Sequence, residues 1–342
     1  MKRLILTGGA GFIGTSFLKF IKDKTDYEVL IIDSLTYASN YNFIDNLLED
    51  KRFCFENCDV RNEIKISKLI NEFAPNIIIN MAAESHVDQS IKNPLKFLDT
   101  NVFGTLNMLR QSNNFYQNLN VNLKKDFRFY QISTDEVYGD NQRYNKPFDE
   151  NHPYNPSSPY SASKASADHF VRSWTRTYGL PTLISTCSNN YGPRQNLEKF
   201  IPTIVNSILS NTKIPVYGNG LQKRDWIFVE DHVDGIFSVL ERGQISYSYN
   251  IGSENVMSNL EIIHFIINEM LKPSQKEIND ISFYNQFISF IEDRPGHDLK
   301  YSLDTSRIRE DLKWLPKHSF EDGMMKTITW YKNKFRSAKN AK

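Results

Sequence analysis

A glycine-rich segment near the start of the chain, Gly8-Gly9-Ala10-Gly11-Phe12-Ile13-Gly14, most constrains the fold. It follows a short apolar run, residues 3–7, and precedes an amphipathic stretch at residues 12–21. A Gly-x-x-Gly-x-x-Gly spacing between a strand and a helix is typical of a loop that binds a dinucleotide pyrophosphate. Glycine permits the tight turn, and the helix N-terminus offers free N–H groups to phosphates. A plain turn is the alternative, because the motif alone is weakly specific.

Apolar runs and helical patterns alternate over the first 190 residues. The apolar runs predict strands at residues 28–33, 53–56, 77–80, 127–133 and 182–187, with helices at 64–73, 95–109 and 160–178. Apolar strands that alternate with helices indicate a parallel sheet covered on both faces. We therefore expect an α/β fold, a doubly wound, Rossmann-like parallel sheet joined to a smaller mixed α/β domain.

The regular alternation fades after residue 190. Helical patterns at 200–209, 231–240, 260–270 and 321–335 are separated by Gly- and Pro-containing segments. We expect residues 1–190 to form the dinucleotide-binding domain, with returns to its sheet near 226–255. Residues 191–342 should form mainly the second domain, interleaved with the first. The Asn-rich segment 113–122 is predicted to be a surface excursion.

The charge balance and the cysteine count narrow the class of protein. Forty-one Lys and Arg against forty Asp and Glu leave a net charge of +1, which argues against a nucleic-acid or polybasic membrane binder. No stretch approaches the ~20 apolar residues of a membrane span, and the first apolar run is too short for a signal peptide. The three cysteines, Cys54, Cys58 and Cys187, form no disulfide framework. We therefore expect reduced thiols in a cytoplasmic protein.

An acidic residue, Asp33, ends the second predicted strand, nineteen residues after Gly14. A carboxylate there can accept hydrogen bonds from the adenosine ribose hydroxyls. The following residues 34–37 include no Arg or Lys to neutralise a 2′-phosphate, which favours NAD over NADP. Asp59-Val60 follows the third strand. This pair could contact adenine, or it could form a helix N-cap. Ala82-Ala83 follows the fourth, where small residues let a ligand approach the backbone.

Groups suited to proton transfer follow the fifth strand and open the next long helix. Ser133-Thr134-Asp135-Glu136 comes first, and Tyr160 and Lys164 lie four apart, on one helix face. A nearby ammonium should lower the Tyr160 pKa towards a general-base range, although such a pair is usually only a surface contact. The adjacent acids suggest an acid and a base for an elimination, or alternatively a loop cap.

These motifs together resemble the extended short-chain dehydrogenase/reductase superfamily, and further segments resemble its dTDP-glucose 4,6-dehydratase family. Those segments run in order along residues 3–332: Leu35-Thr36-Tyr37-Ala38, Ala82-Ala83-Glu84-Ser85-His86-Val87-Asp88, Ser133-Thr134-Asp135-Glu136-Val137-Tyr138-Gly139, Tyr160-Ser161-Ala162-Ser163-Lys164, Ser188-Asn189-Asn190-Tyr191-Gly192-Pro193, Arg224-Asp225-Trp226, Val229-Glu230-Asp231-His232 and Asp293-Arg294-Pro295-Gly296-His297-Asp298. The chain departs from the family at Ser39, usually glycine, at Gln89, usually arginine, and at 299–301, usually more basic.

The resemblance implies an NAD-dependent lyase that converts a nucleoside-diphosphate glucose, dTDP-glucose above others, to a 4-keto-6-deoxy sugar and water. Thr134 would hold the sugar 4-hydroxyl while Tyr160, aided by Lys164, takes its proton. Glu136 would remove the C5 proton and Asp135 would protonate the departing 6-hydroxyl. Hydride would move from C4 to NAD and return to C6, so that no external reductant is needed.

The resemblance also implies two sets of binding residues. The NAD set is Gly8, Gly11, Phe12, Ile13, Gly14, Asp33, Ser34, Leu35, Thr36, Asp59, Val60, Ala82, Ala83, Ser85, Thr100, Tyr160, Lys164 and Asn190. The nucleotide-sugar set, mainly in the second domain, is Ser85, Thr134, Asn189, Lys199, Pro215, Val216, Tyr217, Arg224, Asn259, Asp293, Arg294, Pro295, Gly296 and His297. Lys199 could instead be an ordinary surface charge that binds no substrate. Arg224 could instead form a structural ion pair with Asp225. The scattered histidines predict no metal site.

Three alternatives to this function stay open. A UDP-glucose 4,6-dehydratase, or an epimerase or decarboxylase on the same fold, would use most of the same residues. Asp135 and Glu136 argue against an epimerase, which has no evident use for an elimination pair. A non-catalytic NAD-binding regulatory protein is the third, against which Tyr160 and Lys164 argue. The family resemblance further implies a homodimer through a four-helix interface, formed by the helices at 95–109 and 160–178 of each subunit.

Overall fold

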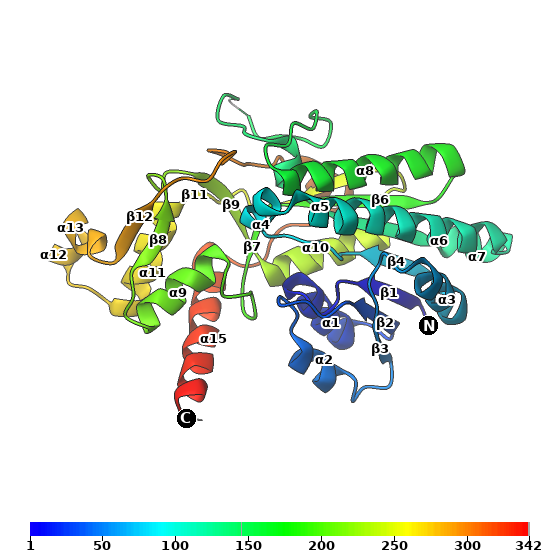
Figure 1. Ribbon diagram of the computed structural model, residues 1–342, viewed down its shortest axis with the longest axis horizontal. Helices are drawn as coiled ribbons and strands as arrows, with labels where there is room; N and C mark the ends of the chain where they lie inside the picture. The colour runs from blue at the N-terminus through cyan, green and yellow to red at the C-terminus, as the bar shows by residue number, and fades with distance from the viewer. Residues whose placement is uncertain (145, 341–342) are drawn as a thin grey trace.

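A parallel sheet of seven strands lies at the centre of the computed structural model, which describes residues 1–144 and 146–340 (Figure 1). Its order is β3-β2-β1-β4-β5-β6-β10, so the strand order reverses between β1 and β4. The strands are β1 Arg3–Thr7, β2 Glu28–Asp33, β3 Phe53–Asn57, β4 Ile77–Asn80, β5 Arg128–Thr134, β6 Thr182–Cys187 and β10 Ser248–Ile251. This confirms the predicted doubly wound fold, in which ligands bind where the strand order reverses.

Alternate residues of each strand pack against helices on opposite faces of the sheet. Leu4 and Leu6 face one core with α1 (Phe12–Lys24) and α10 (Val229–Arg242), together with the shorter α2 (Tyr41–Leu47) and α14 (Ser306–Leu312). Ile5 faces the other core, with α3 (Glu63–Phe73), α6 (Gly104–Asn118) and α8 (Pro159–Tyr178). Because both faces are covered, the strands are rich in apolar residues, which is why most of them read as nearly continuous runs.

The segment predicted as a helix at 95–109 is helical throughout, but it extends to Asn118 and contains a π-helical turn. The segment is divided into α5 (Pro94–Phe97), the π-helical η1 (Leu98–Phe103) and α6, and the Asn-rich stretch continues α6 rather than leaving the fold. Within η1, the Asn101 amide binds the backbone of Glu84, accepting from its N–H at 2.8 Å and donating to its carbonyl at 3.0 Å. Such wide turns commonly occur at functional sites, and this one packs against the loop that follows β4.

The second half of the chain builds a smaller core of its own. Its strands are β7 Asn189–Tyr191, β8 Ile214–Tyr217, β9 Lys223–Phe228, β11 Val256–Ser258 and β12 Ile288–Ile291. Its helices are α9 Phe200–Leu209, α11 Asn259–Leu271, α12 Gln275–Ile278, α13 Ile281–Asn285 and α15 Phe320–Asn340. Although α10, β10 and α14 follow β7 in sequence, they pack in the first core. We therefore propose that residues 1–190 and 191–342 form interleaved rather than separate domains.

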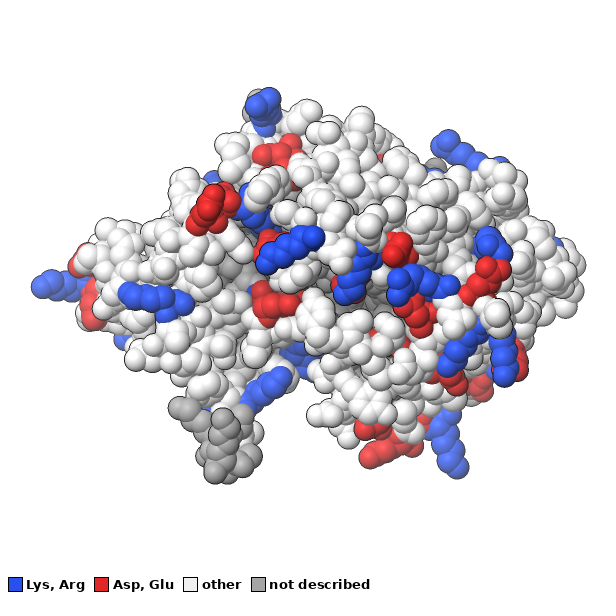
Figure 2. All heavy atoms as spheres, viewed as in Figure 1, with Lys and Arg blue, Asp and Glu red and all other residues white. Residues whose placement is uncertain are grey.

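Charges are mixed over the molecular face shown in Figure 2, where Lys and Arg lie among Asp and Glu rather than in a patch of one sign. Within the described residues, no helix combines the length and the apolar character that crossing a bilayer requires. In the same part of the chain, no three His, Cys, Asp or Glu side chains converge as metal ligands would.

Candidate active site

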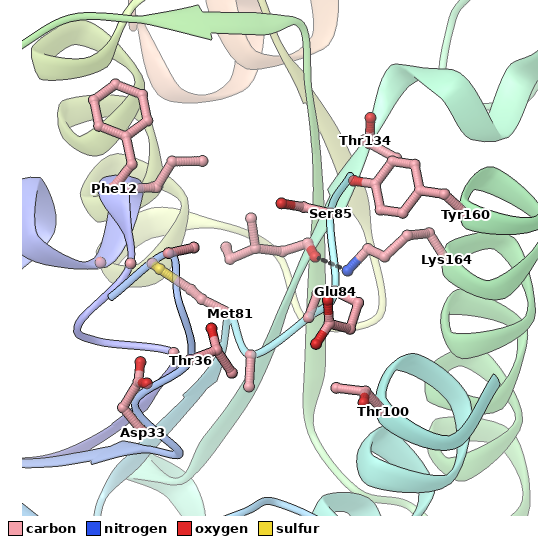
Figure 3. Close-up of a pocket in the computed structure, with 18 of the residues that line it drawn as sticks. Phe12, Asp33, Thr36, Met81, Glu84, Ser85, Thr100, Thr134, Tyr160 and Lys164 are labelled. Atoms are coloured by element: carbon pink, nitrogen blue, oxygen red, sulfur yellow. Dashed lines mark hydrogen bonds between the residues drawn. The ribbon is translucent and has the colours of Figure 1, made fainter. Parts of the chain in front are cut away.

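A cleft with a cavity volume of about 420 Å³ lies at the carboxyl ends of the central strands (Figure 3). Its walls come from the loops that follow β1 to β6 and from the start of α8. The structure brings the following predicted site residues together there: Gly8, Gly11, Phe12, Ile13, Gly14, Asp33, Ser34, Thr36, Asp59, Val60, Ala82, Ala83, Ser85, Thr100, Thr134, Asp135, Glu136, Tyr160, Lys164, Asn189, Asn190 and Lys199.

The glycine loop closes tightly between β1 and β4. Gly8 has a left-handed φ of +70°, and a Cβ there would lie 2.7 Å from the Ala82 backbone nitrogen. A Cβ on Gly14 would lie 2.4 Å from the Gly8 carbonyl oxygen. Neither position has room for a side chain, and the first N–H groups of α1, from Phe12 onward, have no partner within the helix. This cradle fits the phosphates of a dinucleotide.

Asp33 ends β2 and shapes the loop beside that cradle. Its Oδ2 accepts from the Ala10 N–H at 3.0 Å, and its Oδ1 accepts from the Leu35 N–H at 2.9 Å and the Ser39 hydroxyl at 3.2 Å. A carboxylate has about four lone-pair sites, so an acceptor position on Oδ2 stays free for a ribose hydroxyl. The backbone N–H of Leu35, with a φ of +52°, is therefore held by Asp33, while the Leu35 side chain packs on the core.

Asp59 forms an ion pair instead of a helix cap. Its carboxylate lies 2.6 Å from the Arg61 guanidinium, whose hydrogen bond lowers the Asp59 pKa. The N-cap of α3 is Asn62, whose side chain accepts from the Lys65 N–H at 3.0 Å. The helix-cap alternative for Asp59 is therefore wrong, and its contact with adenine stays a prediction.

The two adjacent acids follow β5 in a short 3-10 turn, η2 (Asp135–Tyr138), which Thr134 caps. Asp135 is 3% exposed, and its Oδ2 is buried without a hydrogen-bond partner among the described residues. Burial, together with the neighbouring Glu136 charge, raises the Asp135 pKa well above its usual value. Burial also raises the Glu136 pKa, but Arg294, Arg224 and Lys199 oppose that shift. Both pKa values are thus raised, that of Asp135 more strongly, so that Glu136 is the more readily ionised of the two acids.

Tyr160 and Lys164 reach the same cleft from the first turns of α8, and Figure 3 shows both beside Thr134. The Lys164 ammonium donates to the Ile132 carbonyl at 2.7 Å, and burial lowers the Lys164 pKa. Burial raises the Tyr160 pKa well above its usual value, and Glu136 adds to that shift. The predicted lowering of the Tyr160 pKa is therefore wrong for this structure, because desolvation of the phenolate dominates.

Several predicted substrate residues lie outside the cleft lining. The Val216 side chain is buried in the second core, whereas the Tyr217 hydroxyl donates to Asp88 Oδ2 at 2.8 Å. Arg294 lies 3.5 Å from the other oxygen of Asp88, in α4 (Val87–Lys92). The remaining substrate residues outside the lining are Pro215, Arg224, Asn259, Asp293, Pro295, Gly296 and His297, and Leu35 of the NAD set lies outside it too. Asp88 belongs to one of the sequence segments that resemble the family. Its contacts with Tyr217 and Arg294, which join the two halves of the molecule, are visible only in the structure.

Contacts of the other polar residues further define the site. Arg224 stacks over the Tyr301 ring at 4.2 Å and donates to the Asp298 carbonyl at 2.7 Å. Asp225 instead accepts from the Ser253 hydroxyl at 2.9 Å and from backbone N–H groups, so the ion-pair alternative for Arg224 is wrong. The cleft also contains side chains that the sequence reading did not select, among them Ser39, Met81, Glu84, Cys187 and Glu198. The family segments contain Glu84, Ser39 was noted only as a departure from the family pattern, and no motif marked Met81, Cys187 or Glu198.

Comparison with known proteins gives one family. A protein-family model described as GDP-mannose 4,6 dehydratase matches residues 5–327. A dTDP-glucose 4,6-dehydratase of Neisseria gonorrhoeae is 42% identical over 340 residues, covering 99% of this chain and 98% of that protein. A solved dTDP-glucose 4,6-dehydratase from Bacillus anthracis, in complex with NAD, is 35% identical with a TM-score of 0.84, covering 97% of both chains.

A second solved dTDP-glucose 4,6-dehydratase, DesIV from Streptomyces venezuelae, contains bound NAD. It is 36% identical with a TM-score of 0.86, again over 97% of both chains. The resemblance drawn from the sequence motifs is thereby confirmed over nearly the full length. The chain belongs to the dTDP-glucose 4,6-dehydratase family, within the wider group that the GDP-mannose 4,6 dehydratase model describes.

Proposed function

We propose that the chain catalyses the NAD-dependent conversion of dTDP-glucose to its 4-keto-6-deoxy derivative and water, as a hydro-lyase. The observation that carries this proposal is the pair of buried acids at the end of β5, of which Asp135 holds its proton more strongly than Glu136. An elimination needs a general acid and a general base besides the tyrosine, whereas a simple C4 epimerisation has no evident use for this second pair. The names of relatives that are 42% identical support the same reaction.

NAD is the cofactor that the chain's residues fit. The glycine cradle and Asp33 would hold the pyrophosphate and the adenosine ribose, and residues 34–37 offer no cation to a 2′-phosphate. When bound, NAD supplies reversible hydride acceptance, so that the reaction consumes no external reductant. Two solved relatives contain NAD, which supports this assignment.

The roles of the protein groups follow from their positions. Thr134 holds the sugar 4-hydroxyl and Tyr160 accepts its proton as C4 is oxidised. Burial keeps Tyr160 protonated in the absence of cofactor. The positive charge of the oxidised nicotinamide of NAD would favour the phenolate form, because an opposite charge stabilises it. The 4-ketone acidifies the C5–H bond, and Glu136 takes that proton. Asp135 donates its proton to the C6 oxygen, so that the C6–O bond breaks and water leaves.

The last step restores the cofactor and Glu136, and the proton that Tyr160 took from the 4-hydroxyl replaces, through solvent, the one that Asp135 gave up. A hydride adds to C6 and Glu136 returns a proton to C5, which leaves the cofactor oxidised and the sugar one water lighter. Lys199 and Arg294 lie near enough to stabilise the Glu136 charge, which keeps this carboxylate available as the base. We place the diphosphate of the substrate among the cations of the second core, Lys199, Arg224 and Arg294.

The test is incubation of the purified protein with dTDP-glucose, UDP-glucose and GDP-mannose, each without added reductant. We expect mass spectrometry to show loss of one water from dTDP-glucose, and deuterium at C5 of the product in heavy water. Preference for UDP-glucose would show that the substrate carries uracil rather than thymine. Conversion without a mass change would identify an epimerase, and NAD binding without turnover of any sugar nucleotide would identify a regulatory protein.

We further propose a cytoplasmic homodimer. The helices α6 and α8 pack side by side, and the adjoining η1 leaves Phe103 54% exposed beside the exposed Leu95 and Leu98. Light scattering should give the mass of a dimer, and Phe103→Asp should shift it to that of a monomer. A monomer mass for the unchanged protein at micromolar concentration would contradict this. The free cysteines Cys54, Cys58 and Cys187 support a reducing compartment, which cell fractionation would test.

A further inference from the structure

One buried carboxylate beside the active site has no part in the mechanism above. Asp168 lies in α8 and is 0% exposed. Its Oδ2 accepts from the Ser133 hydroxyl at 2.5 Å and from the Tyr154 hydroxyl at 3.1 Å. Its Oδ1 is buried without a hydrogen-bond partner among the described residues. Burying a carboxylate is unfavourable unless hydrogen bonds or an opposite charge offset its desolvation, so we expect a neighbouring group to stabilise Asp168.

Asp168 lies one helical turn after Lys164, so both side chains project from the same face of α8. The two side chains bind consecutive residues of β5. Lys164 donates to the Ile132 carbonyl at 2.7 Å, while Asp168 accepts from the hydroxyl of Ser133, the next residue. The buried carboxylate is therefore placed beside the buried ammonium, although no direct bond joins them.

Burial raises the pKa of Asp168 itself, and the Lys164 charge opposes that shift more than the Arg172 charge does. Arg172, also in α8, donates to the Tyr154 hydroxyl at 2.8 Å and stacks on the Tyr154 ring at 4.7 Å. Burial raises the pKa values of Tyr154, of Tyr138 in η2 and of Cys187 in β6, so all three stay protonated at neutral pH. Lys164 is thus the cation on the cleft side of this carboxylate.

We propose that Asp168 is a positioning residue for the proposed dehydratase, whose carboxylate keeps Lys164 charged and in place beside Tyr160. Through Ser133 it also holds the end of β5 that presents Thr134, Asp135 and Glu136. This inference rests on the proposed function only for the identity of the reaction, because the effect of Asp168 on the charge of Lys164 does not depend on the substrate. Burial lowers the Lys164 pKa while the Asp168 charge raises it, which is the effect that such a counter-charge has on a buried amine.

The decisive variant is Asp168→Asn, which keeps the size of the side chain and removes its charge. The ammonium of Lys164 should then lose its proton at lower pH, because its counter-charge is gone. We expect the alkaline limb of the pH profile of C4 oxidation to move down by about one pH unit or more. Tyr154→Phe is the matched control, since it removes one hydroxyl partner of Asp168 but keeps the charge, and it should leave the limb in place.

A second readout needs no turnover. With lysine labelled at Cε by carbon-13, NMR follows the titration of Lys164 in the NAD-loaded protein, and Lys164→Arg assigns the signal. We expect the unchanged protein to keep Lys164 protonated above neutral pH, and Asp168→Asn to lower the midpoint. A Lys164 that already titrates below neutral pH in the unchanged protein would overturn the proposal, even if the variant failed to fold.

The two proposals can fail separately. If dTDP-glucose is not dehydrated, the proposed function fails, while the Lys164 midpoint still tests Asp168. If dehydration occurs but Asp168→Asn leaves both the alkaline limb and the Lys164 midpoint unchanged, the role of Asp168 is refuted. A fall in activity with an unchanged pH profile would likewise reduce Asp168 to a packing residue.

Discussion

Replacing Asp135 by asparagine removes the proposed proton donor while keeping the size of its side chain. Asp135 is 3% exposed, so water has little access to act in its place. Glu136 is no substitute, because we assign it the opposite role, that of the base, in the same elimination. Loss of a general acid costs ~10²–10⁴-fold in rate, and the shielded site places Asp135→Asn in the upper part of that range. We therefore expect a barrier about 4–5 kcal/mol higher for water loss.

The assay is a single turnover followed by the absorbance of the reduced nicotinamide. In the unchanged enzyme this signal should rise briefly and fall as hydride returns to C6. In Asp135→Asn it should rise at a similar rate and persist, because the 4-keto sugar forms but cannot lose water. Asp126→Asn, an exposed aspartate at the end of α7 (Val121–Asp126), serves as the matched control and should behave as the unchanged enzyme.

Two results would refute this reasoning. If Asp135→Asn lost water at the unchanged rate, another group would be the acid and the buried pair would serve only the loop. If the variant instead slowed the first rise of reduced nicotinamide as much as the later fall, Asp135 would act in the oxidation of C4 rather than in the elimination.

Three further outcomes follow from the structure. Gly14→Ala should abolish NAD retention in the purified protein, since its Cβ would lie 2.4 Å from the Gly8 oxygen; Gly179→Ala, with no atom within 4 Å, should retain it. Burial lowers the pKa of His232 to about 3, so the free energy of unfolding should decrease as pH falls from ~6.5 towards that value. In urea unfolding, His232→Gln should lose less of this free energy over the same pH range. The Asp135 pKa is raised on folding, so stability falls as pH rises through it; calorimetry should show Asp135→Asn raising the unfolding temperature more at neutral pH than in mild acid.

Short-range patterns in the sequence were enough for most of the central fold. The strands at 28–33, 77–80 and 182–187 and the helix at 200–209 were predicted with their observed bounds. Their signal is local, because a strand buried on both faces is rich in apolar residues and an amphipathic helix must repeat its apolar residues. The glycine loop is local in part, since a Cβ on Gly14 would meet Gly8 within the loop, whereas a Cβ on Gly8 would meet Ala82 after β4.

The sequence also identified most of the cleft, because parallel strands bring their carboxyl ends to one edge of the sheet. It failed where a contact joins distant residues. Nothing near Asp88 in the sequence shows that Tyr217 and Arg294 meet it from the second core. The π-helical turn at Leu98–Phe103 likewise depends on the bond between Asn101 and the Glu84 backbone.

The protonation behaviour of the site was decided by the tertiary structure alone. From the sequence, the spacing of Tyr160 and Lys164 predicts a lowered tyrosine pKa, yet burial raises it. Desolvation sums over every neighbour that excludes water, and most of those neighbours come from other elements of the fold. The same holds for Asp168, whose meeting with Ser133 requires α8 to lie across β5. Residue identity thus determined which groups can exchange protons, and packing determined which of them hold one.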